Sequence, residues 1–145
     1  MNLTDTDSQL VKITLHYRTK DINGFQKVII IEDEKAEEML KDEKRKEEVN
    51  IFNTWWKILS WKDSNNITNN SKVQGKDAVP GELDFYRFRD LRIKMCMKKW
   101  DLKDDDGVDL PLTPDLVNKL PVDIILYLSN KYEQVIGIDE EELGN

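Results

Sequence analysis

One histidine, His16, and one cysteine, Cys96, are the side chains of this chain best suited to nucleophilic or metal chemistry. A Ser-His-Asp triad or a nitrogen–sulfur metal site would depend on them, because such sites need an imidazole or a thiolate. His16 lies on the polar side of an alternating segment, where we expect a surface histidine, and Cys96 is flanked by methionines, which is typical of packing. The six glycines are scattered and form no phosphate-binding loop. The sequence therefore predicts no catalytic residues, no cofactor and no enzyme activity.

Three consecutive aspartates followed by Gly107 form a dense group of oxygen ligands, D-D-D-G. Calcium takes several carboxylate oxygens from one loop, so these residues are candidate ligands. If Gly107 holds the sixth position of an EF-hand loop, however, the first and twelfth positions fall on Leu102 and Thr113 instead of acidic residues. We expect a solvated turn in which Gly107 reverses the chain, and no metal site.

Tryptophan and arginine side chains are the best candidates for contacts with a partner, because both are enriched at interface hot spots. Adjacent tryptophans on a strand cannot both face one core, so at least one of them is expected to meet a partner or to cover the second face of the sheet. The cations at 87–99 alternate with aromatic residues, which suits nucleic acid, but a helix with a cationic outer face has the same composition. We favour a solvated or protein-binding face. The predicted partner interface comprises Trp55, Trp56, Trp61, Arg87 and Arg89.

Composition limits the classes of partner. The chain has 145 residues, of which 35% are charged, and a net charge of -7, so it suits one domain with a sizeable core. The acidic balance disfavours general attraction to nucleic acid or to an anionic membrane. No apolar run approaches the roughly 20 residues that a membrane helix needs. The single cysteine and the polar N-terminal residues predict synthesis in a reducing cytoplasm, without a secretory signal.

The first half of the chain is expected to form a small sheet. After a flexible arm at residues 1–9, Val11, Ile13, Leu15 and Tyr17 alternate with polar residues, as in a half-buried strand. Asn23-Gly24 tolerates positive φ and predicts a hairpin that returns along residues 25–31. A charge-dense helix over residues 32–48 and a third strand over residues 49–61, with aromatic residues on both faces, complete a lobe at residues 10–61.

The second half is expected to be helical. Residues 62–82 are rich in Asn, Ser, Gly and Lys and predict a long loop or linker. Residues 83–100 fit both a helical stripe and a strand-like alternation, and their length and composition favour helix. Thr113-Pro114 is typical of a helix start, Pro121 of a second one, and Gly137 of its end. This gives a helical lobe at residues 83–137, followed by an acidic tail at residues 138–145. The predicted fold class is α+β, a small antiparallel or mixed sheet followed by a helical region.

Residues 85–128 resemble small proteins from the morphogenesis modules of tailed bacteriophages and prophages. A basic-aromatic segment ending in W-D-L, the D-D-D-G turn, L-P-L-T-P, and K-L-P before an aliphatic helix carry the resemblance, which covers about a third of the chain. It implies a non-catalytic tail or head-tail structural or assembly protein that is oligomeric or part of a larger assembly and contacts other particle proteins. We expect it in the host cytoplasm during assembly, and in the virion if it is retained.

Two other functions stay open. A tail-assembly chaperone would act transiently and be missing from finished particles. An acidic phage-encoded inhibitor or adaptor of a host protein would present regularly spaced carboxylates, an arrangement that the interspersed Lys and Arg residues weaken.

Overall fold

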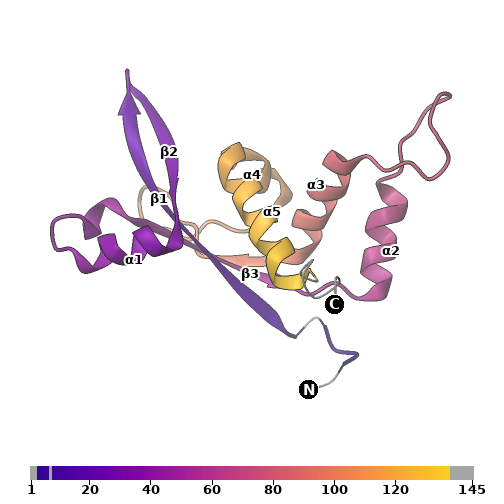
Figure 1. Ribbon diagram of the computed structural model, residues 1–145, viewed down its shortest axis with the longest axis horizontal. Helices are drawn as coiled ribbons and strands as arrows, with labels where there is room; N and C mark the ends of the chain where they lie inside the picture. Colours follow the sequence, from indigo (N-terminus) through magenta and orange to yellow (C-terminus); the bar gives the residue numbers. More distant parts are fainter. Residues whose placement is uncertain (1–2, 7, 138–145) are drawn as a thin grey trace.

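The computed structural model describes residues 3–6 and 8–137. Its elements run β1 (Leu10–Ile22), β2 (Phe25–Ile31), α1 (Asp33–Lys41), the short 3-10 helix η1 (Lys46–Glu48), β3 (Asn50–Lys57), α2 (Trp61–Asn70), α3 (Phe85–Cys96), β4 (Met97–Trp100), α4 (Pro114–Lys119) and α5 (Val122–Ile136). The strands form one antiparallel sheet in the order β2-β1-β3-β4. Residues of α3, α4 and α5 share a hydrophobic core with the sheet, and α2 lies beside α3 (Figure 1). The α+β class predicted from the sequence is confirmed. The predicted tail at 138–145 lies outside the described residues.

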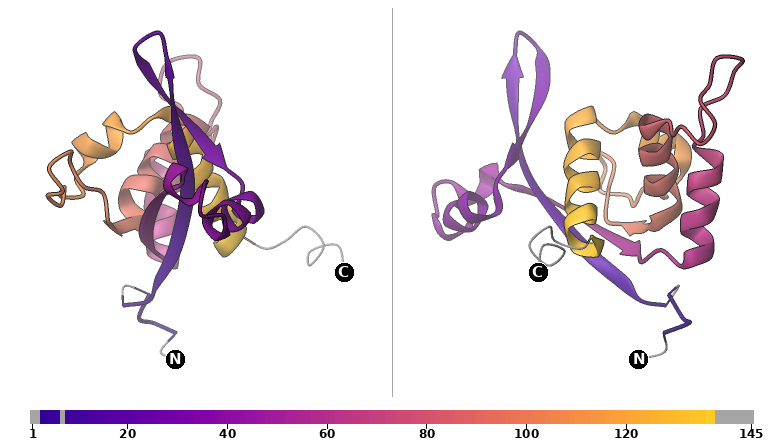
Figure 2. Two further views of the ribbon diagram at one scale, coloured as in Figure 1. Left: turned by 90° about the vertical axis from the view of Figure 1, so that its left-hand side faces the viewer. Right: turned by 45° about the vertical axis from the view of Figure 1, so that its right-hand side comes forward.

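The hairpin of β1 and β2 forms where Asn23-Gly24 predicted it. Both turn residues have positive φ, 53° and 83°, and the Gly24 amide donates to the carboxylate of Asp21 over 2.9 Å. β1 is long enough to pair twice: Leu10 to Tyr17 pair with β3, and His16 to Ile22 pair with β2. Beyond Tyr17 the hairpin is therefore a two-stranded ribbon, and it projects away from α3, α4 and α5 (Figures 1 and 2).

The core lies between one face of the sheet and the C-terminal helices. Of the predicted inward residues of β1, Ile13 and Leu15 are buried, Tyr17 is partly buried against the same cluster, and Val11 lies outside it. From β3, Phe52 and Trp56 join this cluster. From α5, the predicted stripe supplies buried Ile124, Leu128 and Tyr132, whereas Val135 is 51% exposed and lies outside the core. One hydrophobic cluster thus contains residues from both halves of the sequence.

Two predicted elements in the first half are too long. The helix expected over 32–48 ends at Lys41, because the next residues form a turn in which the Asp42 carboxylate accepts from the Lys44 amide, followed by η1. The strand expected over 49–61 ends at Lys57.

The prediction of a loop over residues 62–82 is wrong for its first part, which forms α2. Ser60 caps this helix by accepting from the Asp63 amide over 3.1 Å, and Ile67 is buried beneath it. Ser60 and Asp63 are the residue types that favour a helix start. The asparagine-rich composition concealed that signal.

The helix expected over residues 83–100 is also too long. α3 ends at Cys96, and Met97 to Trp100 form β4 at the edge of β3. Thr113-Pro114 starts α4 as predicted, with the Thr113 hydroxyl accepting from the Leu116 amide over 3.2 Å. Pro121 precedes α5 in the cap position instead of occupying its first turn, and Gly137 follows its last residue.

Candidate partner-binding surface

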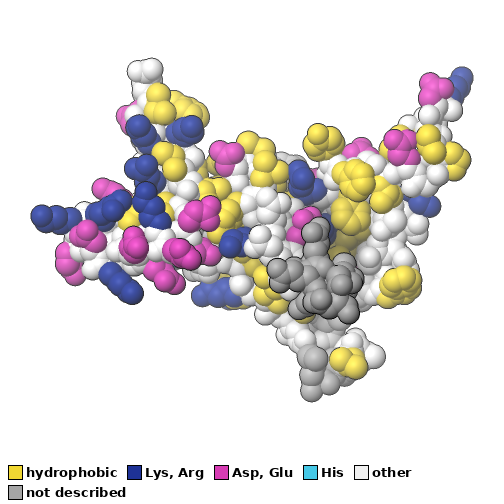
Figure 3. Space-filling model, in the orientation of Figure 1, with side chains coloured by type: hydrophobic (Ala, Val, Ile, Leu, Met, Phe, Trp, Pro, Cys, Tyr) yellow, Lys and Arg dark blue, Asp and Glu magenta, His cyan; other side chains and the backbone are white. Residues whose placement is uncertain are grey.

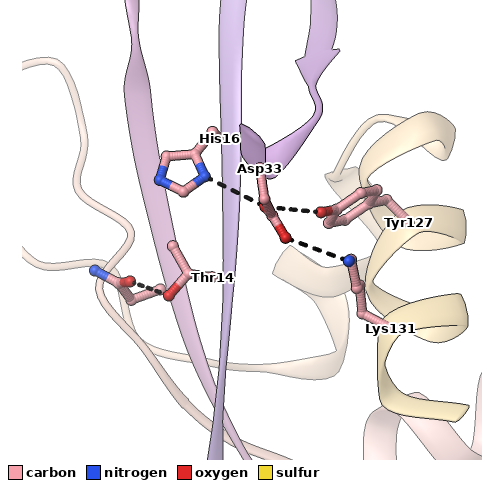
Figure 4. Close-up of polar contacts among 6 residues, drawn as sticks. Thr14, His16, Asp33, Tyr127 and Lys131 are labelled. Atoms are coloured by element: carbon pink, nitrogen blue, oxygen red, sulfur yellow. Dashed lines mark hydrogen bonds and ion pairs between the residues drawn. The ribbon is translucent and has the colours of Figure 1, made fainter. Parts of the chain in front are cut away.

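His16 takes part in a small polar cluster where β1, α1 and α5 meet (Figure 4). Its Nδ1 lies 3.6 Å from the carboxylate of Asp33, beyond hydrogen-bond range. The same carboxylate accepts from the hydroxyl of Tyr127 and from Nζ of Lys131, each over 3.3 Å. Beside it, the Thr14 hydroxyl donates to the side-chain oxygen of Asn53 over 2.8 Å.

Electrostatics keep Tyr127 and Lys131 protonated at neutral pH. Burial and the neighbouring Asp33 raise the pKa of Tyr127. Burial lowers the pKa of Lys131, but Tyr127 and Asp33 outweigh that effect, so the pKa is raised overall. Both groups therefore act as hydrogen-bond donors that fasten α5 to the start of α1.

The D-D-D-G segment forms a tight turn. One oxygen of the Asp104 carboxylate accepts from the amides of Asp106 and Val108, each over 2.9 Å, and Gly107 has φ 78°. Asp104 is thereby used to close the turn. Across residues 3–6 and 8–137, no group of three or more His, Cys, Asp and Glu side chains is placed to hold a metal ion.

Trp56 was predicted to belong to the partner interface, but it belongs to the core. Its side chain is fully buried, stacks on Tyr132 with ring centroids 4.9 Å apart, and donates through Nε1 to the Thr54 hydroxyl over 2.7 Å. The stacking partner comes from a distant helix, so sequence alone could not decide which of two adjacent tryptophans faces inward.

Trp55 and Trp61 lie in different settings. Trp55 is half-buried on the second face of the sheet, where Nζ of Lys12 and Nζ of Lys99 lie 5.6 and 4.8 Å from its ring centroid. Strand register explains this arrangement, because both lysines are cross-strand neighbours of Trp55. Trp61 opens α2 and is 82% exposed, so its ring is available to a partner.

The two arginines of the predicted partner interface, Arg87 and Arg89, also lie in different settings. Arg87 donates through Nε to the backbone oxygen of Asn70 over 2.5 Å and so ties α3 to the end of α2. Arg89 lines a surface groove. Arg92, from the same basic segment, is buried and donates to Ser129 over 3.3 Å and to the carboxylate of Glu133, which places it against α5. The basic segment is therefore not one continuous cationic face.

A groove of about 320 Å³ lies between α3 and the start of α5, with α4 contributing to it. Its apolar lining includes Tyr86, Ile93, Leu120, Val122 and Ile125, and Arg89 and Asp90 supply opposite charges. Tyr86 is 81% exposed and Val122 is 68% exposed. Figure 3 shows hydrophobic side chains gathered over α3 on the face that it draws.

Sequence reasoning missed Tyr86 and Val122. Both lie at the N-terminal ends of their helices, and Val122 falls outside the apolar stripe of α5 that begins at Ile124. The position of Val122 outside this stripe could have predicted its exposure, because an apolar residue that does not lie on the buried face of a helix faces the solvent.

No protein-family model, curated protein or solved structure matches the chain. Among the described helices, none is both long and apolar enough to cross a membrane.

Proposed function

We propose that this chain is a non-catalytic structural or assembly protein of a tailed bacteriophage, associated with the tail or the head-tail junction. It acts through contacts with other particle proteins, in an oligomer or a larger assembly. The resemblance of residues 85–128 to phage morphogenesis proteins suggests the setting, and the structure of that same segment supplies a surface for such contacts.

The groove between α3 and α5 is the observation that carries the proposal. An apolar depression with exposed Tyr86 and Val122 beside it suits an anchoring aliphatic or aromatic side chain of a partner protein. Arg89 and Asp90 can fix the orientation of such a segment by hydrogen bonds. The polar cluster around Asp33 is explained by fastening α1 to α5.

Deletion of the gene from the phage or prophage that carries it tests the proposal. We expect particles that fail to complete their tails or lack a junction component, visible by electron microscopy and by quantitative mass spectrometry of purified particles. Normal particles with unchanged composition would contradict the proposal. In the wild type, the presence of the chain in finished virions identifies a component, and its absence combined with a deletion defect identifies a transient chaperone.

A further inference from the structure

A hollow of about 200 Å³ lies where the base of the β1–β2 hairpin meets α1. Arg18 and Ile29 are cross-strand partners and Ile31 follows two residues later, so all three side chains lie on the face of the hairpin that α1 covers. From α1, Lys35 and Met39 are four residues apart and share one side of the helix. Figure 1 shows α1 beside the base of the hairpin. Two elements of the fold therefore enclose the hollow.

Arg45 supplies a third cation from the turn after α1. Its backbone amide donates to the carbonyl of Asp42 over 3.0 Å, and the Asp42 carboxylate accepts from the amide of Lys44 over 2.9 Å. This tight turn brings Arg45 back to the hollow, which it lines together with Arg18 and Lys35. Cations from a strand, a helix and a turn thus meet around one small space.

The positive charge of the hollow is not neutralised within the part of the chain that the structure describes. No carboxylate in residues 3–6 and 8–137 forms an ion pair with Arg18, Lys35 or Arg45. Glu32 also lines the hollow, so three cations and one acid leave the lining with a formal charge of +2. The chain as a whole has a net charge of -7, so acids to pair with these cations are not scarce. Grouped cations repel one another, and a bound dianion would turn this repulsion into attraction.

The hollow is also partly apolar. Ile31 and Met39 belong to the small hydrophobic cluster beneath α1, and Ile29 is half-buried beside them. Apolar lining next to cations suits a ligand with a short carbon group beside its anionic group. Sites for drug-sized ligands have volumes of roughly 300–1,000 Å³, so this smaller hollow favours a small ligand.

We propose that this hollow binds a small phosphate monoester. Such an ester carries a charge of about -1.5 to -2 at pH 7 and has strong acceptor oxygens, which match the charge of the lining. Arg18 and Arg45 offer planar forks of donors suited to phosphate, and Lys35 adds a compact third cation. A carboxylate or a sulfate ester has only one charge and would leave part of the repulsion in place. The hollow is separate from the groove between α3 and α5, so this inference does not depend on the proposed function.

Phenyl phosphate and phenyl sulfate test the site, because they have similar shapes and differ in charge. Each is titrated into the isotope-labelled full chain, and amide chemical shifts are followed by two-dimensional NMR. We expect saturable shifts at residues 29–35 and at Arg45 with phenyl phosphate, and at least about tenfold weaker binding of phenyl sulfate, because it lacks one charge. Inorganic phosphate should bind more weakly than phenyl phosphate, since it lacks the apolar group. Equal affinity for the two esters, or shifts that do not saturate, would overturn the proposal.

A matched pair of triple variants assigns the binding to these side chains. The site variant carries Arg18→Gln, Lys35→Gln and Arg45→Gln, and it should bind phenyl phosphate at least about tenfold more weakly than the wild type does. The control variant removes the same charge from exposed lysines elsewhere, by Lys62→Gln, Lys76→Gln and Lys119→Gln, and should keep the wild-type affinity. All six side chains are exposed, so both variants should melt as the wild type does. Equal affinity of the two variants would contradict the assignment.

Phosphatidylcholine vesicles that contain phosphatidic acid distinguish two sources of the phosphate monoester. Sedimentation of the wild type with these vesicles, lost in the site variant, would support a lipid headgroup as the ligand. Binding of phenyl phosphate without sedimentation would support a free ester. Sedimentation without any binding of phenyl phosphate would overturn the proposal, because it would indicate attraction to a charged surface and no site in the hollow.

Discussion

The three tryptophans near β3 and α2 give a graded prediction for stability. Trp56→Ala removes a fully buried ring that stacks on Tyr132 and donates to Thr54. Truncation of a buried aromatic leaves a cavity and costs about 3–5 kcal/mol. Trp61 is 82% exposed, so Trp61→Ala should change the free energy of unfolding by no more than about 0.5 kcal/mol.

Trp55→Ala should fall between these limits. The half-buried ring is held between Lys12 and Lys99, and each contact of this type contributes about 0.5–1 kcal/mol when partly exposed. A loss of about 1–2 kcal/mol is therefore expected.

Urea unfolding followed by far-UV circular dichroism measures all three variants on one scale. The urea midpoint should be highest for Trp61→Ala, lower for Trp55→Ala and lowest for Trp56→Ala. The dependence of the free energy of unfolding on urea concentration should be the same for all three if unfolding stays two-state. A conservative control, Trp56→Phe, should recover part of the loss by refilling the cavity. If Trp61→Ala destabilised the protein as much as Trp56→Ala, the assignment of Trp56 to the core and Trp61 to the surface would be refuted.

Three further predictions address the elements that hold the fold together. The hydrogen bond from Lys57 holds the pKa of Asp63 below its ordinary value. The unfolded state therefore binds a proton at Asp63 more readily than the folded state does, so the stabilisation that the ionised Asp63 gives to the fold is lost as pH falls. Asp63→Asn should therefore destabilise the protein most at neutral pH. The difference in the free energy of unfolding between this variant and the wild type, measured by chemical unfolding, should shrink below about pH 4. A difference that does not change with pH would contradict this reasoning. Thr113→Ala removes the cap of α4 and should cost about 1 kcal/mol in urea unfolding, whereas Thr113→Ser should be nearly neutral. Gly107→Ala forces a side chain to φ 78° and should cost about 1 kcal/mol, with Gly107→Asn less harmful; equal stability of Gly107→Ala and the wild type would count against the strained turn.

Local signals predicted the elements whose chemistry is contained in a few adjacent residues. Asn23-Gly24 predicted the hairpin because both residues tolerate positive φ, and the alternation of β1 predicted which face would be buried. Thr113-Pro114 predicted the start of α4 for a similar reason, since a cap and a fixed φ act within one turn.

Elements that depend on distant partners were not predictable in this way. Met97 to Trp100 become a strand because β3 offers an edge to pair with, and no local residue specifies that edge. Ile67 is the one buried residue within α2, and the polar composition of this helix resembles a loop.

The candidate site was only partly visible in the sequence. Arg89 was predicted to be a partner residue, but the groove that it lines combines α3 with α4 and α5, and β4 and the loop after it separate α3 from these two helices in the chain. Likewise, the choice between Trp55 and Trp56 depends on which face of the sheet the helices cover.

Incorporation of groove variants into particles tests the central claim, that this protein works through the surface between α3 and α5, most directly. Phage carrying Tyr86→Ala with Val122→Asn should yield particles with little or none of the chain by quantitative mass spectrometry, while the isolated variant melts as the wild type does. The control Val79→Asn removes an apolar side chain outside the groove. Val79 is 63% exposed and Val122 is 68% exposed, so the two side chains are comparable, and the control variant should be incorporated normally. Wild-type levels of the groove variant in fully formed, infective particles would contradict the account.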